Sequence, residues 1–127
     1  KALSLGRQMD AERIMSQAMA NVDERLRSPD QIDESQVEEL ALEALKLDEI
    51  QSGAARAKWV LRTYRRLRRL PARTVAESVS RLPAASLESV TAELDDLVAS
   101  APVSKLTPRE AEGLARLETL RAQLHGN

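Results

Sequence analysis

The feature that most constrains the fold is the spacing of apolar residues, which recur every three or four positions along most of the chain. In the first such stretch, which runs from about residue 9 to residue 27, they are Ile14, Met15, Ala18, Met19, Val22 and Leu26. This is the period of one helix face. The apolar 43% comes almost entirely from Leu, Ala, Val and Ile, with no Phe, one Trp and one Tyr. Such a composition favours helices over strands, and we expect an all-α protein.

A long central helix is predicted after the first one. The segment Ser28-Pro29-Asp30 should end the first helix, and Ser35 with Glu38 has the pattern of a capping box that starts the second. No Pro follows before Pro71. The apolar positions then continue at helical spacing through Val37, Leu40, Ala44, Leu47, Ile50, Ala54, Ala57, Leu61 and Tyr64. A bend or break near Gln51-Ser52-Gly53 is the alternative, but we favour one continuous helix of about 35 residues.

Three shorter elements are predicted in the remaining sequence. A short helix should span about Thr74 to Leu82, and another should begin at Ser86 with Leu87, Val90, Leu94 and Leu97 on one face. Residues 99–104 are typical of a loop. Thr107 and Glu110, on either side of Pro108 and Arg109, form the most specific cap signal of the chain, for a last helix that runs to about Leu124. Its apolar residues are Leu114, Leu117, Leu120 and Leu124, and Gly126 can end it.

These elements predict a single helical domain over residues 1–127, a bundle of about five helices with one long central helix. The long helix should pack against the first, fourth and last helices. We expect Trp59, Leu61, Tyr64, Leu94 and Leu117 among its buried residues.

Residues for catalysis or metal binding are scarce. The only His is His125, near a chain end that we expect to be frayed, and there is no Cys. The few Gly form no phosphate-binding loop. The carboxylates Glu38, Glu39, Glu43, Asp48 and Glu49 fit a solvated helix face. We therefore expect no catalytic residue, metal or cofactor, and a protein that is not an enzyme. The absence of Cys and of a long apolar run favours an intracellular location without a membrane span.

An arginine-rich segment stands out from this background. It contains no Asp or Glu, and its basic residues are Arg56, Lys58, Arg62, Arg65, Arg66, Arg68, Arg69 and Arg73. Arg suits bidentate pairing with carboxylates or phosphates, so an acidic protein surface and a nucleic-acid backbone both fit as partners. The acidic residues 34–49 and Asp95-Asp96 offer pairing within a helical assembly, and simple solvation is a further alternative. The net charge of −1 and the scarcity of aromatic rings weigh against nucleic acid.

The segment from Ala55 to Leu70 (ARAKWVLRTYRRLRRL) resembles the central helix of GINS subunits, and most of all the Sld-five-type subunit. Trp59-Val60-Leu61 stands at that family's aromatic-apolar step, and Thr63-Tyr64 at its Ser-Tyr step. Residues 10–26 are similar to the preceding Met-rich and Glu-rich helix, and residues 105–110 to the entry into the last helix. The family's N-terminal motif is not visible in residues 1–8, and the region before Gly53 is longer than usual.

The resemblance implies a non-catalytic scaffold of a heterotetramer that joins the MCM motor and its RecJ-like cofactor in the replicative DNA helicase, nuclear if the source is eukaryotic. It implies that the chain is a truncated helical domain without the small β domain that normally follows. The residues that would serve its core and its contacts with sister subunits are Arg56, Trp59, Leu61, Arg62, Tyr64, Arg65, Arg68 and Leu70. The alternative is a helical DNA-binding or DNA-packaging accessory protein that uses the Arg56–Arg73 segment.

Overall fold

The computed structural model describes residues 2–27, 33–51 and 53–126. Within these ranges every regular element is helical, which confirms the all-α class. There are seven α-helices and one short 3₁₀ helix in this part of the chain, more than the five predicted. They are α1 (Ala2–Arg25), α2 (Glu34–Gln51), α3 (Ala55–Leu67), α4 (Arg73–Ser80), α5 (Ala84–Ser89), α6 (Thr91–Ala99), η2 (Val103–Lys105) and α7 (Pro108–His125). No helix among the described residues is long and apolar enough to cross a membrane.

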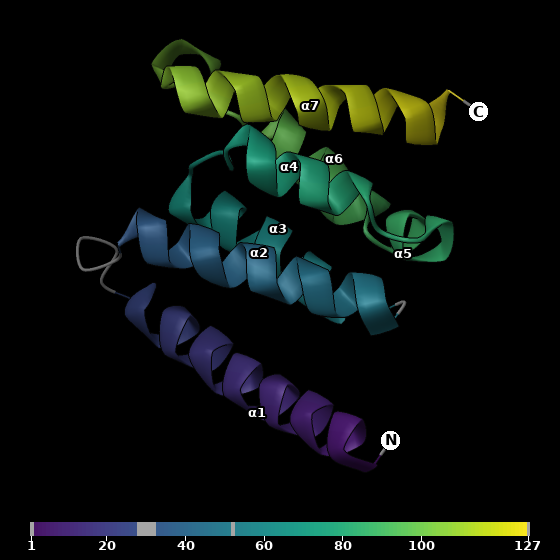
Figure 1. Ribbon diagram of the computed structural model, residues 1–127. Helices are drawn as coiled ribbons and strands as arrows, with labels where there is room; N and C mark the ends of the chain where they lie inside the picture. The colour runs from purple at the N-terminus through teal and green to yellow at the C-terminus, as the bar shows by residue number, and fades with distance from the viewer. Residues whose placement is uncertain (1, 28–32, 52, 127) are drawn as a thin grey trace.

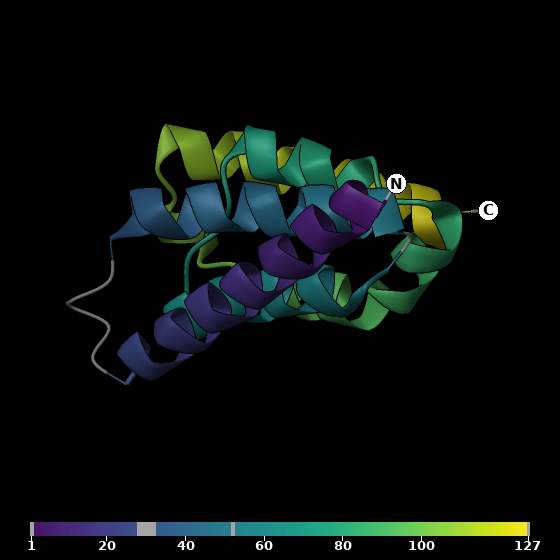
Figure 2. The same ribbon diagram turned by 60° about the horizontal axis from the view of Figure 1, so that its bottom comes forward.

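The helices stack in layers with α1 at one side and α7 at the other (Figure 1). Helix α2 packs against α1, α3 and α4, while α7 packs against α4 and α6. Helix α3 lies behind α2 in Figure 1 and also packs against α6. Seen from the side of α1, this first helix runs obliquely across α2 and α3 (Figure 2). The arrangement makes α1 a peripheral helix and places α2, α3 and α4 in the interior of the stack.

The predicted long central helix is wrong, because α2 and α3 are separate helices that pack against each other. Ser52 lies outside the described residues, but the backbone N–H of Gly53 still donates to the carbonyl of Asp48 at 3.0 Å. The buried carboxylate of Asp48 then accepts from the backbone N–H of Ala57 at 2.7 Å. Ala57 is in the first turn of α3, where the N–H groups lack partners within the helix. Asp48 therefore caps a helix that begins seven residues later, at Ala55.

Two predicted helix caps are wrong and one is confirmed. Asp33 caps α2 in place of Ser35, since its carboxylate accepts from the Ser35 N–H at 2.9 Å. Helix α5 begins at Ala84, directly after Pro83, so Ser86 lies inside it as a buried residue. The capping box of Thr107 and Glu110 is present at the start of α7. The predicted stop at Ser28-Pro29-Asp30 lies outside the described residues.

The predicted helix from Ser86 consists of two helices, because α5 ends at Ser89 and α6 begins at Thr91. Of its predicted face, Val90, Leu94 and Leu97 are buried and Leu87 is partly buried. The short helix predicted near Thr74 is α4, and η2 overlaps the end of the predicted loop.

The core is almost wholly aliphatic and extends through every layer. Of the five residues predicted to be buried, Leu61, Tyr64, Leu94 and Leu117 are buried, while Trp59 is partly buried. Ile50, predicted on the apolar face, is 64% exposed instead. The core members are Met15, Val37, Ala41, Ala44, Leu45, Ala57, Val60, Leu61, Tyr64, Leu70, Val75, Ala76, Val79, Leu82, Val90, Leu94, Leu97, Leu114, Leu117 and Leu120.

Close backbone contact joins α7 to the start of α4. A Cβ atom on Gly113 would lie 1.7 Å from the carbonyl oxygen of Pro71, which is far inside van der Waals contact. Only glycine lets the two segments approach so closely.

Candidate functional site

Helix α3 carries most of the residues predicted to form the site, and it divides them between two faces. Its inner face is buried and consists of Ala57, Val60, Leu61, Thr63 and Tyr64. The arginines lie around the remaining surface, as helical spacing dictates. No aspartate or glutamate belongs to α3. Acidic partners for its arginines therefore come from other elements.

Arg56 forms the most buried ion pair of the site, at the start of α3. Its guanidinium donates to the carboxylate of Asp48 at 3.0 Å, and the two side chains are 17% and 1% exposed. A second guanidinium nitrogen lies 3.6 Å from the carboxylate of Glu12 on α1. The side-chain carbonyl of Gln51 accepts a further hydrogen bond from Arg56 at 3.0 Å. Arg56 thus ties α1, α2 and α3 together, and the prediction that Asp48 lies on a solvated face is wrong.

Three arginines on the outer side of α3 pair with carboxylates of α1 and α6. Arg62 lies 3.0 Å from Glu93, Arg65 lies 3.7 Å from Asp96, and Arg66 lies 3.3 Å from Asp23. Each of these arginine side chains is more than half exposed. The Arg65 and Arg66 pairs are exposed at both partners, and such pairs contribute little to stability, at most about 1 kcal/mol each, whereas Glu93 is only 13% exposed. The three pairs nevertheless neutralise part of the positive charge on this surface.

The arginines beyond α3 also have partners, with one exception. Arg69 lies 3.0 Å from Glu34 and 3.8 Å from Glu110, and Arg73 pairs with Glu77 at 2.8 Å. Arg68 makes no ion pair with any described residue. It instead ends α3 in the left-handed conformation, with φ of 56° and ψ of 39°.

Of the seven arginines in the segment, six therefore contact a carboxylate of the same chain: Arg56, Arg62, Arg65, Arg66, Arg69 and Arg73. Lys58, the remaining basic residue, also makes no ion pair with a described residue.

Trp59 is held at the contact between α3 and α1. Its indole N–H donates to the carboxylate of Asp23 at 3.0 Å, and the same oxygen lies 3.3 Å from Arg66. The ring is partly buried against the core. A partly buried indole with a satisfied N–H is typical of Trp at a contact between elements.

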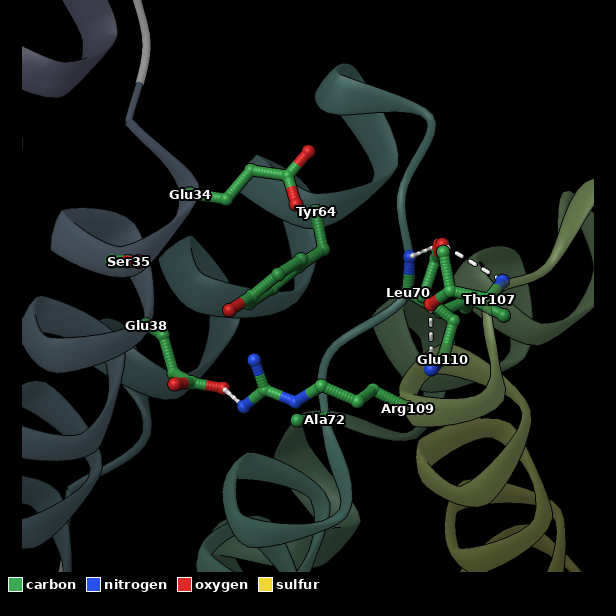
Figure 3. A pocket seen from close by; sticks show the side chains of 9 residues that line it. All are labelled: Glu34, Ser35, Glu38, Tyr64, Leu70, Ala72, Thr107, Arg109 and Glu110. Carbon is green, nitrogen blue, oxygen red and sulfur yellow. Dashed lines mark hydrogen bonds and ion pairs between the residues drawn. The ribbon is translucent and has the colours of Figure 1, made fainter.

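Tyr64 borders a small polar cavity between the first turns of α2 and α7 (Figure 3). The cavity has a volume of about 160 Å³. Burial of the ring, together with the negative charges of Glu38 and Glu34, raises the pKa of Tyr64 above its usual range. The phenol consequently stays protonated. Arg109 and Glu38, which also line the cavity, form an ion pair at 2.9 Å.

Leu70 and the last-helix cap meet on the other side of this cavity (Figure 3). One carboxylate oxygen of Glu110 accepts from the backbone N–H of Leu70 at 3.0 Å, and the other accepts from the N–H of Thr107 at 3.3 Å. The Thr107 hydroxyl in turn accepts from the N–H of Glu110 at 3.2 Å. The cap therefore fixes the turn after α3 as well as the start of α7.

Sequence reasoning missed the role of Asp48. The buried face of α2 consists of Val37, Ala41, Ala44, Leu45 and Asp48. The helical period, continued from Val37, Ala41 and Ala44, would have placed Asp48 on this buried face. Its negative charge instead led to the prediction of a solvent-exposed side chain.

His125, predicted to lie in a frayed chain end, is the last residue of α7 and contacts α6. Its ring nitrogen lies 2.9 Å from both carboxylate oxygens of Asp95, and Arg121 donates to the same carboxylate at 2.8 Å. The hydrogen bond with His125, assisted by that from Arg121, lowers the pKa of Asp95. The described residues contain no cluster of three or more His, Cys, Asp or Glu side chains that could hold a metal ion.

The chain matches no known protein-family model, no curated protein and no solved structure.

Proposed function

We propose that this chain is a non-catalytic scaffold subunit of a heteromeric complex similar to GINS, which would support the replicative DNA helicase. The observation that carries the proposal is the pairing of the arginine segment, in which six of seven arginines contact carboxylates of the same chain. Five of these six arginines pair with carboxylates of other elements, and the largely buried Arg56 links α3 to α1 and α2. Such a role fits an assembly module, whose surface must be rigid to bind its partners with little loss of entropy.

The resemblance of residues 55–70 to the central GINS helix supports the finer proposal. In this structure residues 55–67 of this segment form α3, which contacts α1, α2 and α6, directly or through ion pairs. Trp59 and Tyr64, which correspond to the family's aromatic positions, both border contacts between helices. Sister subunits and, through them, the MCM motor and its RecJ-like cofactor are the partners that the proposal implies.

The test is co-elution of the purified chain with candidate GINS sister subunits at micromolar concentration. We expect a stable complex on size-exclusion chromatography. Arg62→Glu, at an exposed position of α3, should weaken the complex, whereas Arg116→Glu on α7 serves as a charge-matched control. Failure to co-elute with any candidate set of sister subunits would reject the GINS proposal.

Direct DNA binding by the Arg56–Arg73 segment is the second candidate. The same ion pairs weigh against it, because phosphates would have to displace carboxylates that are already in place. A salt series on duplex and single-stranded DNA separates the two candidates. Phosphate contacts make log affinity fall steeply with log salt, and replacing Arg62, Arg65 and Arg66 by Ala should reduce that slope. Absence of binding at low salt would reject the DNA candidate.

A further inference from the structure

An apolar groove lies between α1 and α2, on the opposite side of the molecule from α7. It has a volume of about 410 Å³. The residues that line it are Ile14, Met15, Ala18, Leu40, Glu43, Lys46, Leu47 and Ile50. Two of them, Ile14 and Ile50, are each 64% exposed and are among the few large apolar side chains that the described residues leave in water. Exposed apolar residues gathered in one place mark an interaction surface more often than single ones do.

The two charged residues of the groove have no ion-pair partner among the described residues. Glu43 and Lys46 both line the groove and are exposed, and neither forms an ion pair with any described residue. By contrast, Glu38 and Asp48 on the same helix are paired with Arg109 and Arg56. The groove thus holds one free negative and one free positive charge, three residues apart on α2.

The order of these residues along α2 is self-complementary. Leu40 and Ile50 lie at the two ends of the groove-lining stretch, and Glu43 and Lys46 lie on either side of its midpoint. If a second α2 approaches antiparallel, the apolar end of one copy meets the apolar end of the other. Glu43 of each copy then faces Lys46 of the other. Residues that exchange places in this way are the signature of an isologous, two-fold interface.

We propose that a second copy of this chain occupies the groove, forming a two-fold dimer in which the two α2 helices run antiparallel. Burial of Ile14, Leu40, Leu47 and Ile50 would drive association, and reciprocal Glu43–Lys46 pairs would fix the register. The dimer is independent of the GINS proposal, since it is measured on the chain alone. It is compatible with a heteromeric complex that contains two copies of this subunit.

Charge reversal tests the proposal, because a two-fold interface makes each pair reciprocal. The purified chain should dimerise on sedimentation at concentrations up to about 100 µM, a range that covers weak specific dimers. Glu43→Lys alone would place four lysines at the centre of the interface, and Lys46→Glu alone would place four glutamates there. Either variant should weaken the dimer about tenfold or more, since like charges brought together oppose association strongly.

Mixing the two variants gives the decisive result. In an equimolar mixture of Glu43→Lys and Lys46→Glu chains, every facing pair is attractive again, so a mixed dimer should form. The Glu43→Lys/Lys46→Glu double variant should likewise dimerise by itself. Glu49→Lys and Lys105→Glu carry the same charge changes outside the groove and should leave the dimer intact. Circular dichroism at equal concentration checks that each variant keeps its helix content.

Several outcomes would overturn the proposal. A chain that stays monomeric at about 100 µM does not form this dimer. A dimer that tolerates both single reversals uses a different face. Single variants that are monomeric and whose mixture stays monomeric would show that Glu43 and Lys46 do not face each other across a two-fold axis.

Discussion

The carboxylate of Asp48 supplies the acceptor that the first turn of α3 requires. It lies on α2, is 1% exposed, and binds both the Ala57 N–H and the Arg56 guanidinium. Replacing it with Ala removes the cap and takes from the largely buried Arg56 its closest carboxylate, leaving only Glu12 at 3.6 Å. We expect Asp48→Ala to lower the free energy of unfolding by about 3 kcal/mol, measured by urea denaturation.

The neighbouring exposed carboxylate provides the control for Asp48. Glu49→Ala should change the free energy of unfolding by no more than about 0.5 kcal/mol. Equal losses for the two variants would mean that Asp48 does not act as the cap of α3.

Arg68 holds the left-handed position at which α3 ends, and it is exposed. Its N–H and that of Arg69 bond back to the carbonyls of Arg65 and Tyr64, each at 3.1 Å. Glycine adopts this conformation without the steric cost that other L-residues bear. We expect Arg68→Gly to raise the free energy of unfolding by about 0.5 to 1 kcal/mol in a urea titration, despite the loss of a side chain.

Replacing an arginine by glycine in the middle of α3 should instead lower the free energy of unfolding. Arg65→Gly places glycine in a helix interior and should destabilise the protein by about 1 kcal/mol. A loss of stability for Arg68→Gly as well would contradict the view that Arg68 contributes through its backbone conformation alone.

At the scale of the elements, the Glu110 carboxylate joins α7 to the turn between α3 and α4. Burial raises its pKa, but hydrogen bonds from the Leu70 and Thr107 N–H groups and the charge of Arg69 outweigh burial, so the pKa lies below its usual range. A group whose pKa is lower in the folded state stabilises the protein at pH values above its unfolded-state pKa, which is about 4.3 for Glu. This stabilisation is lost as the pH falls further. Glu110→Gln should therefore destabilise the protein at pH 7 and flatten the fall in stability below about pH 4.5.

Urea midpoints at a series of pH values between 7 and 3 test this prediction. Glu112→Gln, at an exposed position of α7, should keep the acid dependence of the unmodified chain. If Glu110→Gln shows that same dependence, Glu110 does not contribute to stability through its ionisation.

Local signals explain which elements could be predicted from sequence. The cap of α7 was predictable because Thr107 and Glu110 form reciprocal hydrogen bonds within a span of four residues. The break between α2 and α3 was predicted only as the alternative, from Gly53, since apolar residues continue at helical spacing across it and the stabilising contact reaches from Asp48 to Ala57. Asp33 and Ser35 are both good caps, and the sequence alone does not choose between them. For the candidate site, the arginines were visible, but their partners lie on other helices and depend on tertiary packing.

At the level of the whole molecule, two helices pack chiefly against a single neighbour. Helix α1 packs chiefly against α2 and the short α5 against α6, whereas α2, α3, α4, α6 and α7 each pack against at least two other helices. The side chains of α1 add the Glu12 contact with Arg56 and the Asp23 contact with Trp59, both near the surface. The groove proposed to bind a second copy lies beside α1. The local stability of α1 and self-association should therefore be coupled, because the dimer would cover a long helix that otherwise packs chiefly against one neighbour.

Hydrogen exchange measures both the local stability of α1 and the self-association of the chain. In a dilute sample, amides of α1 should exchange through openings at least about 2 kcal/mol less costly than those of α7, because few buried contacts need to break. In a concentrated sample, protection of α1 should rise while that of α7 stays the same, since only α1 and α2 face the second copy. The Glu43→Lys variant, which keeps the fold but opposes the dimer, should lose this dependence on concentration. Uniform protection of α1 and α7 in the dilute sample would show instead that the bundle opens as one cooperative unit.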